Sequence, residues 1–330
     1  MSKRVVGLLS DFGEGPYAGI MRAVIRSVGG DDIDVIDIDH SIPSFNVISG
    51  AYVLAHSYYW LPKGSVIVAV VDPGVGSSRP ALAVKTKNYV FIGPDNGLLF
   101  PAAQRDGIVK VYKLDEKKVV QRAKLRFRGS LPNGKWVISK TFHGRDVFAP
   151  AAALIASGSA DLEELGDEIG VDRIRKASID YVERVNGGND TLRVQVVYVD
   201  KFGNVALSAR VDRLPWSPKL MGEKNAFIIV DVSGQASMTK ESEPPTGMVQ
   251  VARFVSTFSE GRPNELIAYF NSFGHLELAV NRGNAAKRLG VHPEMKVTIT
   301  LELLPHGGHG GERRGARRRH SDDLAYTAMP

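Results

Sequence analysis

The chain has 330 residues and a mass of 35.9 kDa, with 43% hydrophobic and 24% charged residues. This composition excludes a disordered or fibrous protein and predicts about two globular domains, since single cores rarely grow beyond about 250 residues. The absence of cysteine excludes disulfides, thiolate metal sites and a cysteine nucleophile, and 42 Lys and Arg against 36 Asp and Glu give a formal net charge of +6.

The N-terminus is basic, but the apolar stretch that follows is too short for a signal peptide. The longest apolar run, Val66–Val71, has the length of a strand and is far shorter than the roughly 20 residues that span a bilayer. We therefore expect a cytoplasmic protein with no membrane partner.

Short β-branched runs alternate with helical patterns over the first 160 residues. Strands are predicted at 4–10, 35–38, 66–71, 81–86 and 89–92, and several are apolar on both faces, as in a sheet covered on both sides. Helices are predicted at 16–28 and around 47–58, the second one capped by Ser44. This order predicts an α/β domain over residues 1–180, with a mostly parallel sheet flanked by helices.

Eight Lys and Arg, and no acidic residue, lie between Lys117 and Lys140. Such a segment, with Trp136 inside it, could contact nucleic-acid phosphates, but no recognised nucleic-acid motif accompanies it. Runs of like charge are usually solvated surface. We therefore interpret residues 117–140 as a solvated basic insertion and expect no nucleic-acid partner.

The composition of the sequence changes after residue 157. Residues 158–190 are acidic and rich in Gly and Asn around 187–190, and we interpret them as a connector. Strands are then predicted at 192–199, 204–207, 226–232, 248–256, 276–280 and 295–303. Their short spacing is typical of a small barrel or sandwich, so we expect a C-terminal β domain over residues 190–304. The tail at 305–330 is rich in Gly, His and Arg and is expected to be disordered, with His306 and His309 too few to hold a metal alone.

Polar residues follow three predicted strands of the first domain. Ligands bind outside the carboxyl ends of parallel strands, so Asp11, Asp72 with Arg79, and Asp95 are expected to meet on one rim of the sheet. The sequence has neither a dinucleotide-binding glycine pattern nor a phosphate-binding loop. Asp11 fits a carboxylate that accepts both hydroxyls of a ribose, and equally a cap of the next helix.

Three further polar clusters lie elsewhere in the chain. His143 is either a structural residue or a proton-handling group, and Arg145 beside Asp146 is predicted to form an ion pair within the domain. The segments 198–204 and 271–284 are unusually polar for a β domain, although a turn would explain the first of them.

Six motifs occur in a characteristic order along the chain. They are Ser-Asp-Phe-Gly at 10–13, Val-Asp-Pro-Gly-Val-Gly at 71–76 with Arg79, Gly-Pro-Asp-Asn-Gly at 93–97, Phe-His-Gly-Arg-Asp at 142–146, Asp-x-Phe-Gly-Asn at 200–204 and Asn-Ser-x-Gly at 271–274. With this set the chain resembles, over roughly residues 4–304, the S-adenosyl-L-methionine hydroxide adenosyltransferases, which are related to the fluorinase and chlorinase that make adenosyl halides.

The resemblance implies an α/β domain, a C-terminal β-barrel, and a homotrimer whose active sites lie between one subunit's first domain and its neighbour's second. It implies S-adenosyl-L-methionine as substrate, adenosine and L-methionine as products, and no metal or cofactor. Asp11 would bind the ribose diol, Asp200 the methionine ammonium and Ser272 its carboxylate. The remaining implied contacts are Asn204 and the segment around Asn281 for adenine, Thr141 and Phe142 around the reacting carbon, and Phe12 and Phe202.

The hydrolases and the halogenases of this group differ at positions that this sequence shows. The fluorinase has a tyrosine and a threonine where this chain has Asp72 and Val75, and a tyrosine and a halide-contacting serine where it has His143 and Gly144. The resemblance therefore implies the hydrolase triad Asp72, Arg79 and His143 as catalytic residues, with water attacking C5′ of the ribose. An adenosyl halide synthase and a non-catalytic adenosine-binding protein remain the alternatives.

Overall fold

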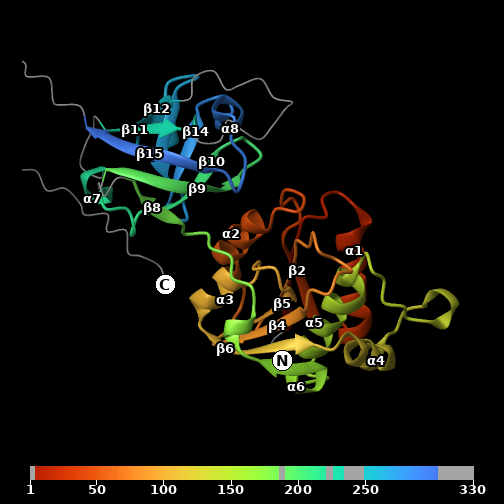
Figure 1. Ribbon diagram of the computed structural model, residues 1–330. Helices are drawn as coiled ribbons and strands as arrows, with labels where there is room; N and C mark the ends of the chain where they lie inside the picture. The colour runs from red at the N-terminus through yellow and green to blue at the C-terminus, as the bar shows by residue number, and fades with distance from the viewer. Residues whose placement is uncertain (1–3, 186–189, 221–225, 234–248, 304–330) are drawn as a thin grey trace, which may run out of the picture. The chain divides into compact units, whose positions relative to one another are not determined.

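The computed structural model describes residues 4–185, 190–220, 226–233 and 249–303 (Figure 1). The chain divides into two compact units, residues 1–179 and 180–330. The centre of the predicted connector, at 187–189, and the tail from residue 305 lie outside the described residues. No helix of the described ranges is both long and apolar enough to cross a membrane.

The first unit contains a seven-stranded sheet with the order β2-β1-β3-β5-β4-β6-β7. The strands are β1 (Arg4–Ser10), β2 (Ile33–Asp39), β3 (Val66–Val70), β4 (Ala81–Thr86), β5 (Val90–Pro94), β6 (Ile108–Leu114) and β7 (Gly166–Ile169). All strands run in one direction except β4 and β7, so the sheet is mostly parallel, as predicted. The prediction of a connector from residue 158 was wrong for β7, which pairs with β6 at the edge.

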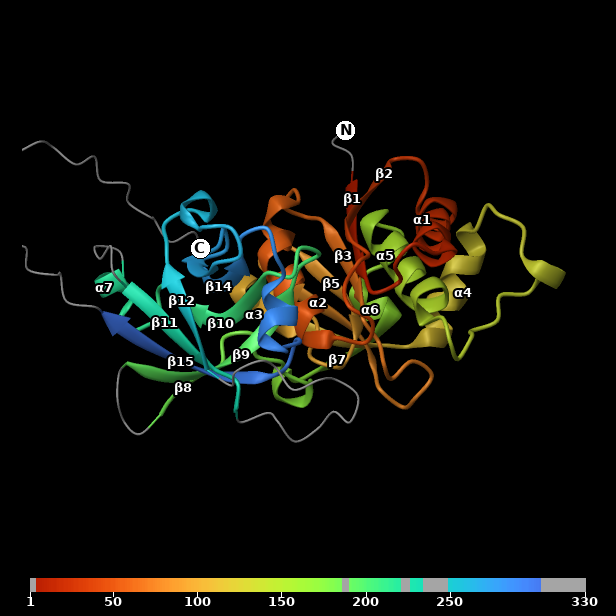
Figure 2. The ribbon, with the colours of Figure 1, turned by 90° about the horizontal axis from the view of Figure 1, so that it is seen from above.

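Helices cover both faces of this sheet, with α2 and α3 on one side and α1, α4 and α5 on the other (Figure 2). They are α1 (Pro16–Gly29), α2 (Val47–Ser57), α3 (Phe100–Asp106), α4 (Glu116–Arg126) and α5 (Ala149–Ala156), followed by the short α6 (Leu162–Leu165). The observed cap of α2 lies two residues after the predicted one. Asn46, not Ser44, caps this helix, and its side chain accepts the Ser49 N–H at 2.8 Å.

The basic segment 117–140 differs from the prediction of a solvated insertion. Its first half is α4, which Asp115 caps and which packs on the core through Val119, Val120 and Ala123. The arm after the helix also contributes to the core, because the buried ring of Trp136 lies edge-on to Phe127 with the ring centres 5.2 Å apart. The positive charges of α4 therefore lie on its outer face, while its inner face covers the sheet.

The second unit is a β-barrel, as predicted. Seven strands pair in the order β10-β14-β13-β12-β11-β15-β9, and a further pairing of β9 with β10 closes the barrel, while β8 extends it beside β9. The elements are β8 (Val182–Arg184), β9 (Thr191–Val199), β10 (Val205–Arg210), α7 (Ser217–Leu220), β11 (Ala226–Asp231), β12 (Val249–Phe254), β13 (Leu266–Phe270), β14 (His275–Val280), α8 (Ala285–Leu289) and β15 (Lys296–Leu303). The sequence analysis missed β8 and β13.

Candidate active site

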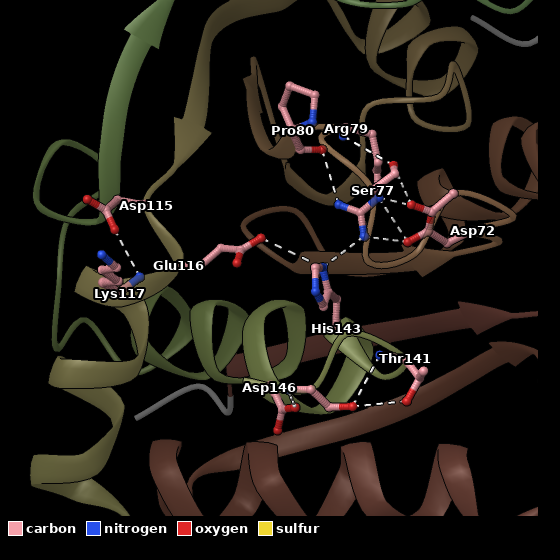
Figure 3. A network of polar contacts seen from close by, with 12 residues as sticks. Asp72, Ser77, Arg79, Pro80, Asp115, Glu116, Lys117, Thr141, His143 and Asp146 are labelled. Atoms are coloured by element: carbon pink, nitrogen blue, oxygen red, sulfur yellow. Dashed lines mark hydrogen bonds and ion pairs between the residues drawn. The ribbon is translucent and has the colours of Figure 1, made fainter. Parts of the chain in front are cut away.

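A buried ion pair stands in the loop between β3 and β4 (Figure 3). Arg79 Nε lies 3.0 Å from each oxygen of Asp72, and Arg79 Nη2 donates to Asp72 Oδ2. Arg79 Nη1 donates to the Pro80 carbonyl at 3.3 Å, so the guanidinium is held on three sides. The side chain of Asp72 is 5% exposed and that of Arg79 is 10% exposed, so the pair is largely desolvated. Its several hydrogen bonds also fix its geometry.

The loop reaches this position because Gly76 lies against the backbone at Lys140. A Cβ at Gly76 would stand 2.2 Å from the Lys140 carbonyl oxygen, and its φ of +77° is in the left-handed region. The loop after β3 therefore packs closely on the segment that leads to His143.

His143 joins the ion pair from that segment. Its Nδ1 lies 3.1 Å from Arg79 Nη2, and its side chain is 8% exposed. A π-helical turn, Gly144–Phe148, begins directly after it, and such turns occur preferentially at functional sites. The structure thus brings the three predicted catalytic residues, Asp72, Arg79 and His143, into one hydrogen-bonded cluster.

A carboxylate that the sequence analysis missed completes this cluster. Glu116, the first residue of α4, has its Oε1 3.7 Å from His143 Nδ1 (Figure 3). Its sequence signal was the Asp115 cap followed by apolar residues at helical spacing, which the high charge of the segment obscured.

Asp11 follows β1 and accepts the Phe45 N–H through Oδ2 at 2.8 Å. It does not cap α1, because that helix begins after Gly15 without a side-chain cap, so the capping interpretation was wrong. Burial raises the pKa of the Asp11 carboxyl above its ordinary value, and the negative charge of Asp72 adds to this effect. Asp11 and Asp72 therefore interact electrostatically at the same rim. Phe45, which the sequence analysis missed, has a φ of 65° and is 69% exposed.

Aromatic rings gather beside this rim. Phe12, Tyr17 and Phe142 contact one another, with ring centres 5.1 to 5.7 Å apart. Arg145 lies over the Phe142 ring at 5.3 Å and forms the predicted ion pair with Asp146. Thr141 precedes Phe142, and its backbone N–H donates to Ser139 Oγ at 3.1 Å.

Asp95 lies at the expected rim, since it follows β5 and its backbone N–H donates to the Pro80 carbonyl at 3.0 Å, but its side chain contacts a different segment. Its Oδ1 accepts the Arg175 N–H at 2.8 Å, and the residue is buried. We assign Asp95 to holding the segment at Arg175, because none of the hydrogen bonds among the described residues joins it to Asp72 or Asp11.

In the second unit, Asp200 organises the turn between β9 and β10. Its Oδ1 accepts the N–H groups of Phe202 and Asn204, and its Oδ2 accepts the Asn204 side-chain amide, each at 2.9 Å. Gly203 has a φ of +84°, and a Cβ there would lie 2.1 Å from the Asn284 carboxamide. The turn is fixed, and the Phe202 ring is exposed on it.

The turn between β13 and β14 carries Ser272. Asn271 Oδ1 accepts the N–H groups of Phe273 and His275, and its amide donates to Glu277 Oε2 at 2.8 Å. Burial raises the pKa of Glu277, and the negative charge of Asp200 adds to this.

Asn281 donates through its side chain to the Gly261 carbonyl at 2.6 Å. The predicted site residues therefore fall into both units: Asp11, Phe12, Asp72, Arg79, Thr141, Phe142 and His143 in the first, and Asp200, Phe202, Asn204, Ser272 and Asn281 in the second. Across the described ranges, no three His, Asp or Glu side chains cluster in a way that could hold a metal ion.

Comparison with known families gives two adjacent matches. Residues 6–166 match the SAM hydroxide adenosyltransferase N-terminal domain, and residues 194–298 match the C-terminal domain of the same family.

Relatives match along almost the whole chain. A protein named (R)-S-adenosyl-L-methionine hydrolase from Thermus thermophilus is 34% identical over 90% of this chain and 99% of its own length. A hydrolase of the same name from Salinispora tropica is 35% identical over 81% of this chain and 86% of its own length. A fluorinase from Actinopolyspora mzabensis is 23% identical over 91% of this chain and 98% of its own length. The crystal structure of an uncharacterized conserved protein from Thermotoga maritima superposes with a TM-score of 0.70 at 30% identity, covering 89% of this chain and 99% of that one.

Proposed function

This chain belongs to the SAM hydroxide adenosyltransferase family, and on that premise we propose that it hydrolyses S-adenosyl-L-methionine to adenosine and L-methionine. The observation that carries the proposal is the buried cluster of Asp72, Arg79 and His143, because water needs groups that orient it and accept its proton. The relatives named hydrolase, at 30% to 35% identity, support the same activity.

The reaction is an in-line displacement at C5′ of the ribose. The oxygen of water forms the bond to C5′, the C5′–S bond breaks with its electron pair going to sulfur, and L-methionine leaves as a neutral thioether. The sulfonium already carries the positive charge, so the leaving group needs no general acid. Hydroxide attack on a sulfonium neutralises charge, and a closed site favours such a step.

The geometry divides the roles within the triad. Both oxygens of Asp72 accept hydrogen bonds from Arg79, so proton transfer to Asp72 would break the ion pair. We therefore assign Asp72 to orienting the water, Arg79 to fixing Asp72 and holding the developing hydroxide, and His143 to taking the proton.

Two features disfavour an adenosyl halide synthase. By the resemblance, Asp72 replaces a tyrosine of the fluorinase, and a carboxylate is a poorer neighbour for a halide than a neutral phenol. Gly144 supplies no hydroxyl to contact a halide, and a Cβ there would already lie 3.0 Å from Met21 Sδ.

We also propose that the protein is a cytoplasmic homotrimer that needs no metal. The assembly is supported by the resemblance of the whole chain to the family. Light scattering on the purified protein should give three times the 35.9 kDa chain mass. Dialysis against a chelator should leave turnover unchanged.

The function is tested by incubating the protein with S-adenosyl-L-methionine in H₂¹⁸O and analysing the nucleoside by mass spectrometry. Adenosine with ¹⁸O in its 5′-hydroxyl is expected. Unlabelled adenosine or methylthioadenosine would refute displacement at C5′. Adenosyl halide formed in the presence of chloride or fluoride would support the synthase, and stoichiometric binding without turnover would support a binding protein.

A further inference from the structure

Glu277 is a half-buried residue of β14 that has no part in the function proposed above. β14 lies between β10 and β13, and Glu277 stands opposite Ala206 on the first and Tyr269 on the second. Both of its carboxylate oxygens accept hydrogen bonds, Oε1 from the Tyr269 hydroxyl and Oε2 from the Asn271 side-chain amide at 2.8 Å. The two donors hold the carboxylate in one orientation.

A carboxylate at this position is unfavourable for the barrel. Burial raises the pKa of Glu277 and the negative charge of Asp200 adds to this, whereas the two hydrogen bonds oppose it. The ion pairs among the described residues of the barrel include neither Glu277 nor Asp200. An apolar residue is often at least as stable as a buried charge, so the hydrogen bonds of Glu277 have to account for its presence.

The contact with Asn271 determines the geometry of the turn between β13 and β14. Asn271 Oδ1 accepts the Phe273 N–H at 3.0 Å and the His275 N–H at 3.1 Å, so the oxygen of this carboxamide faces the turn. The amide nitrogen then points away from the turn and needs an acceptor, which Glu277 Oε2 supplies. Ser272 is exposed between Asn271 and Phe273. Glu277 therefore fixes the carboxamide that shapes the backbone around Ser272.

We propose that Glu277 is a positioning residue that acts through Asn271 and holds the Ser272 turn in the conformation that binds the carboxylate of the substrate's methionine moiety. The inference rests on the proposed hydrolase function and on the contact that the resemblance implies for Ser272. Without an acceptor at residue 277 the Asn271 carboxamide is free to rotate, and two backbone N–H groups of the turn lose their common acceptor. The substrate then loses affinity at its methionine end, while displacement at C5′ is unaffected once the substrate is bound.

The kinetic test removes the acceptor in the full chain and measures adenosine release. Glu277→Leu removes both oxygens and keeps an apolar side chain of similar size, and Glu302→Leu makes the same change at an exposed position of β15. We expect Glu277→Leu to raise KM about tenfold with kcat within about twofold of wild type, because losing one charge-assisted hydrogen bond corresponds to about that factor. Glu302→Leu should match wild type.

An exchange of donor and acceptor tests the contact itself. Glu277→Gln alone should stay close to wild type, because its amide oxygen accepts from Asn271 and the Tyr269 hydroxyl turns to accept its N–H. Asn271→Asp keeps the oxygen that faces the turn but sets a second carboxylate against Glu277, so it should raise KM at least as much as Glu277→Leu. Combining Asn271→Asp with Glu277→Gln restores a donor opposite an acceptor and should recover most of the lost affinity. A double variant with the KM of Asn271→Asp would overturn the proposal.

A binding experiment separates this role from the hydrolase function. In the His143→Gln background, which should not turn over, Glu277→Leu should weaken calorimetric binding of S-adenosyl-L-methionine about tenfold and leave that of adenosine unchanged. If wild type releases no adenosine, the hydrolase function fails, while these titrations still decide the role of Glu277. If wild type turns over but Glu277→Leu keeps its KM and affinity, the role of Glu277 is refuted and the hydrolase function stands. Equal weakening of both ligands would also refute it.

Discussion

The Asp72–Arg79 pair allows a prediction about stability that is separate from catalysis. Removing one partner of a buried ion pair leaves an uncompensated charge and costs about 3–5 kcal/mol, whereas replacing both by apolar residues of similar volume is often neutral. The side chains of Asp72 and Arg79 are 5% and 10% exposed, so most of the pair is shielded from water. We expect Asp72→Leu and Arg79→Met each to destabilise the first unit by about 3–5 kcal/mol. The double variant should lie within about 1–2 kcal/mol of wild type.

The assay is calorimetric unfolding of the four proteins at pH 7. For a unit of this size, the single variants should lower Tm by about 6–20 °C, and the double variant should recover most of that loss. All three variants should lose turnover, so recovered stability without recovered activity would separate the two roles of the pair. An additive double variant, or Asp72→Leu within 1 °C of wild type, would refute the reasoning.

Three other predictions concern the rest of the molecule. Glu265 pairs with Arg253, whose hydrogen bonds lower the pKa of Glu265 to about 2, so its stabilisation is present above pH 4.5 and is lost as the pH falls toward 2. Because the pair is partly exposed and screened by water, Glu265→Gln should cost only about 1 kcal/mol at pH 7 and nearly nothing at pH 2 in urea titrations. Gly203→Ala should destabilise the barrel by at least about 1 kcal/mol, through the left-handed φ and the clash with Asn284, and should raise KM in adenosine-release assays. Trp136→Ala should destabilise the first unit by about 3 kcal/mol in calorimetry, an effect that a solvated loop would not show.

The sequence was sufficient for the parts of the fold that local patterns determine. Apolar runs between turn residues gave most strands, and the rule that ligands bind at the carboxyl ends of parallel strands gave the rim with Asp11 and Asp72. The same rule placed Asp95 correctly at this rim, but it did not show that its side chain accepts the Arg175 N–H, because a strand end fixes where a residue lies and not which backbone group its side chain meets. The continuous apolar run Leu266–Phe270 forms β13, a strand that the sequence analysis did not predict.

The error at residues 117–140 has a physical cause and a functional consequence. Net charge describes the outer face of a helix, whereas burial depends on a few positions, here Val119, Val120 and Ala123. Because the segment was interpreted from its charge, helix α4 was not predicted, and the carboxylate of its first residue, Glu116, was not recognised. The approach of Glu116 to His143 depends on how α4 docks on the core, which no local pattern in the sequence encodes.

The electrostatic character of the first unit's rim gives a reason for the choice of substrate. With the carboxyls ionised, Asp11, Asp72 and Glu116 against the guanidinium of Arg79 carry a formal charge of −2 in total. Burial opposes this charge and raises the pKa of Asp11, so binding of a cation that offsets the charge is favoured. A sulfonium offsets the charge and a halide adds to it. Attack at C5′ then removes the positive charge from sulfur, so the attraction that holds the substrate is lost in the products and their release is favoured.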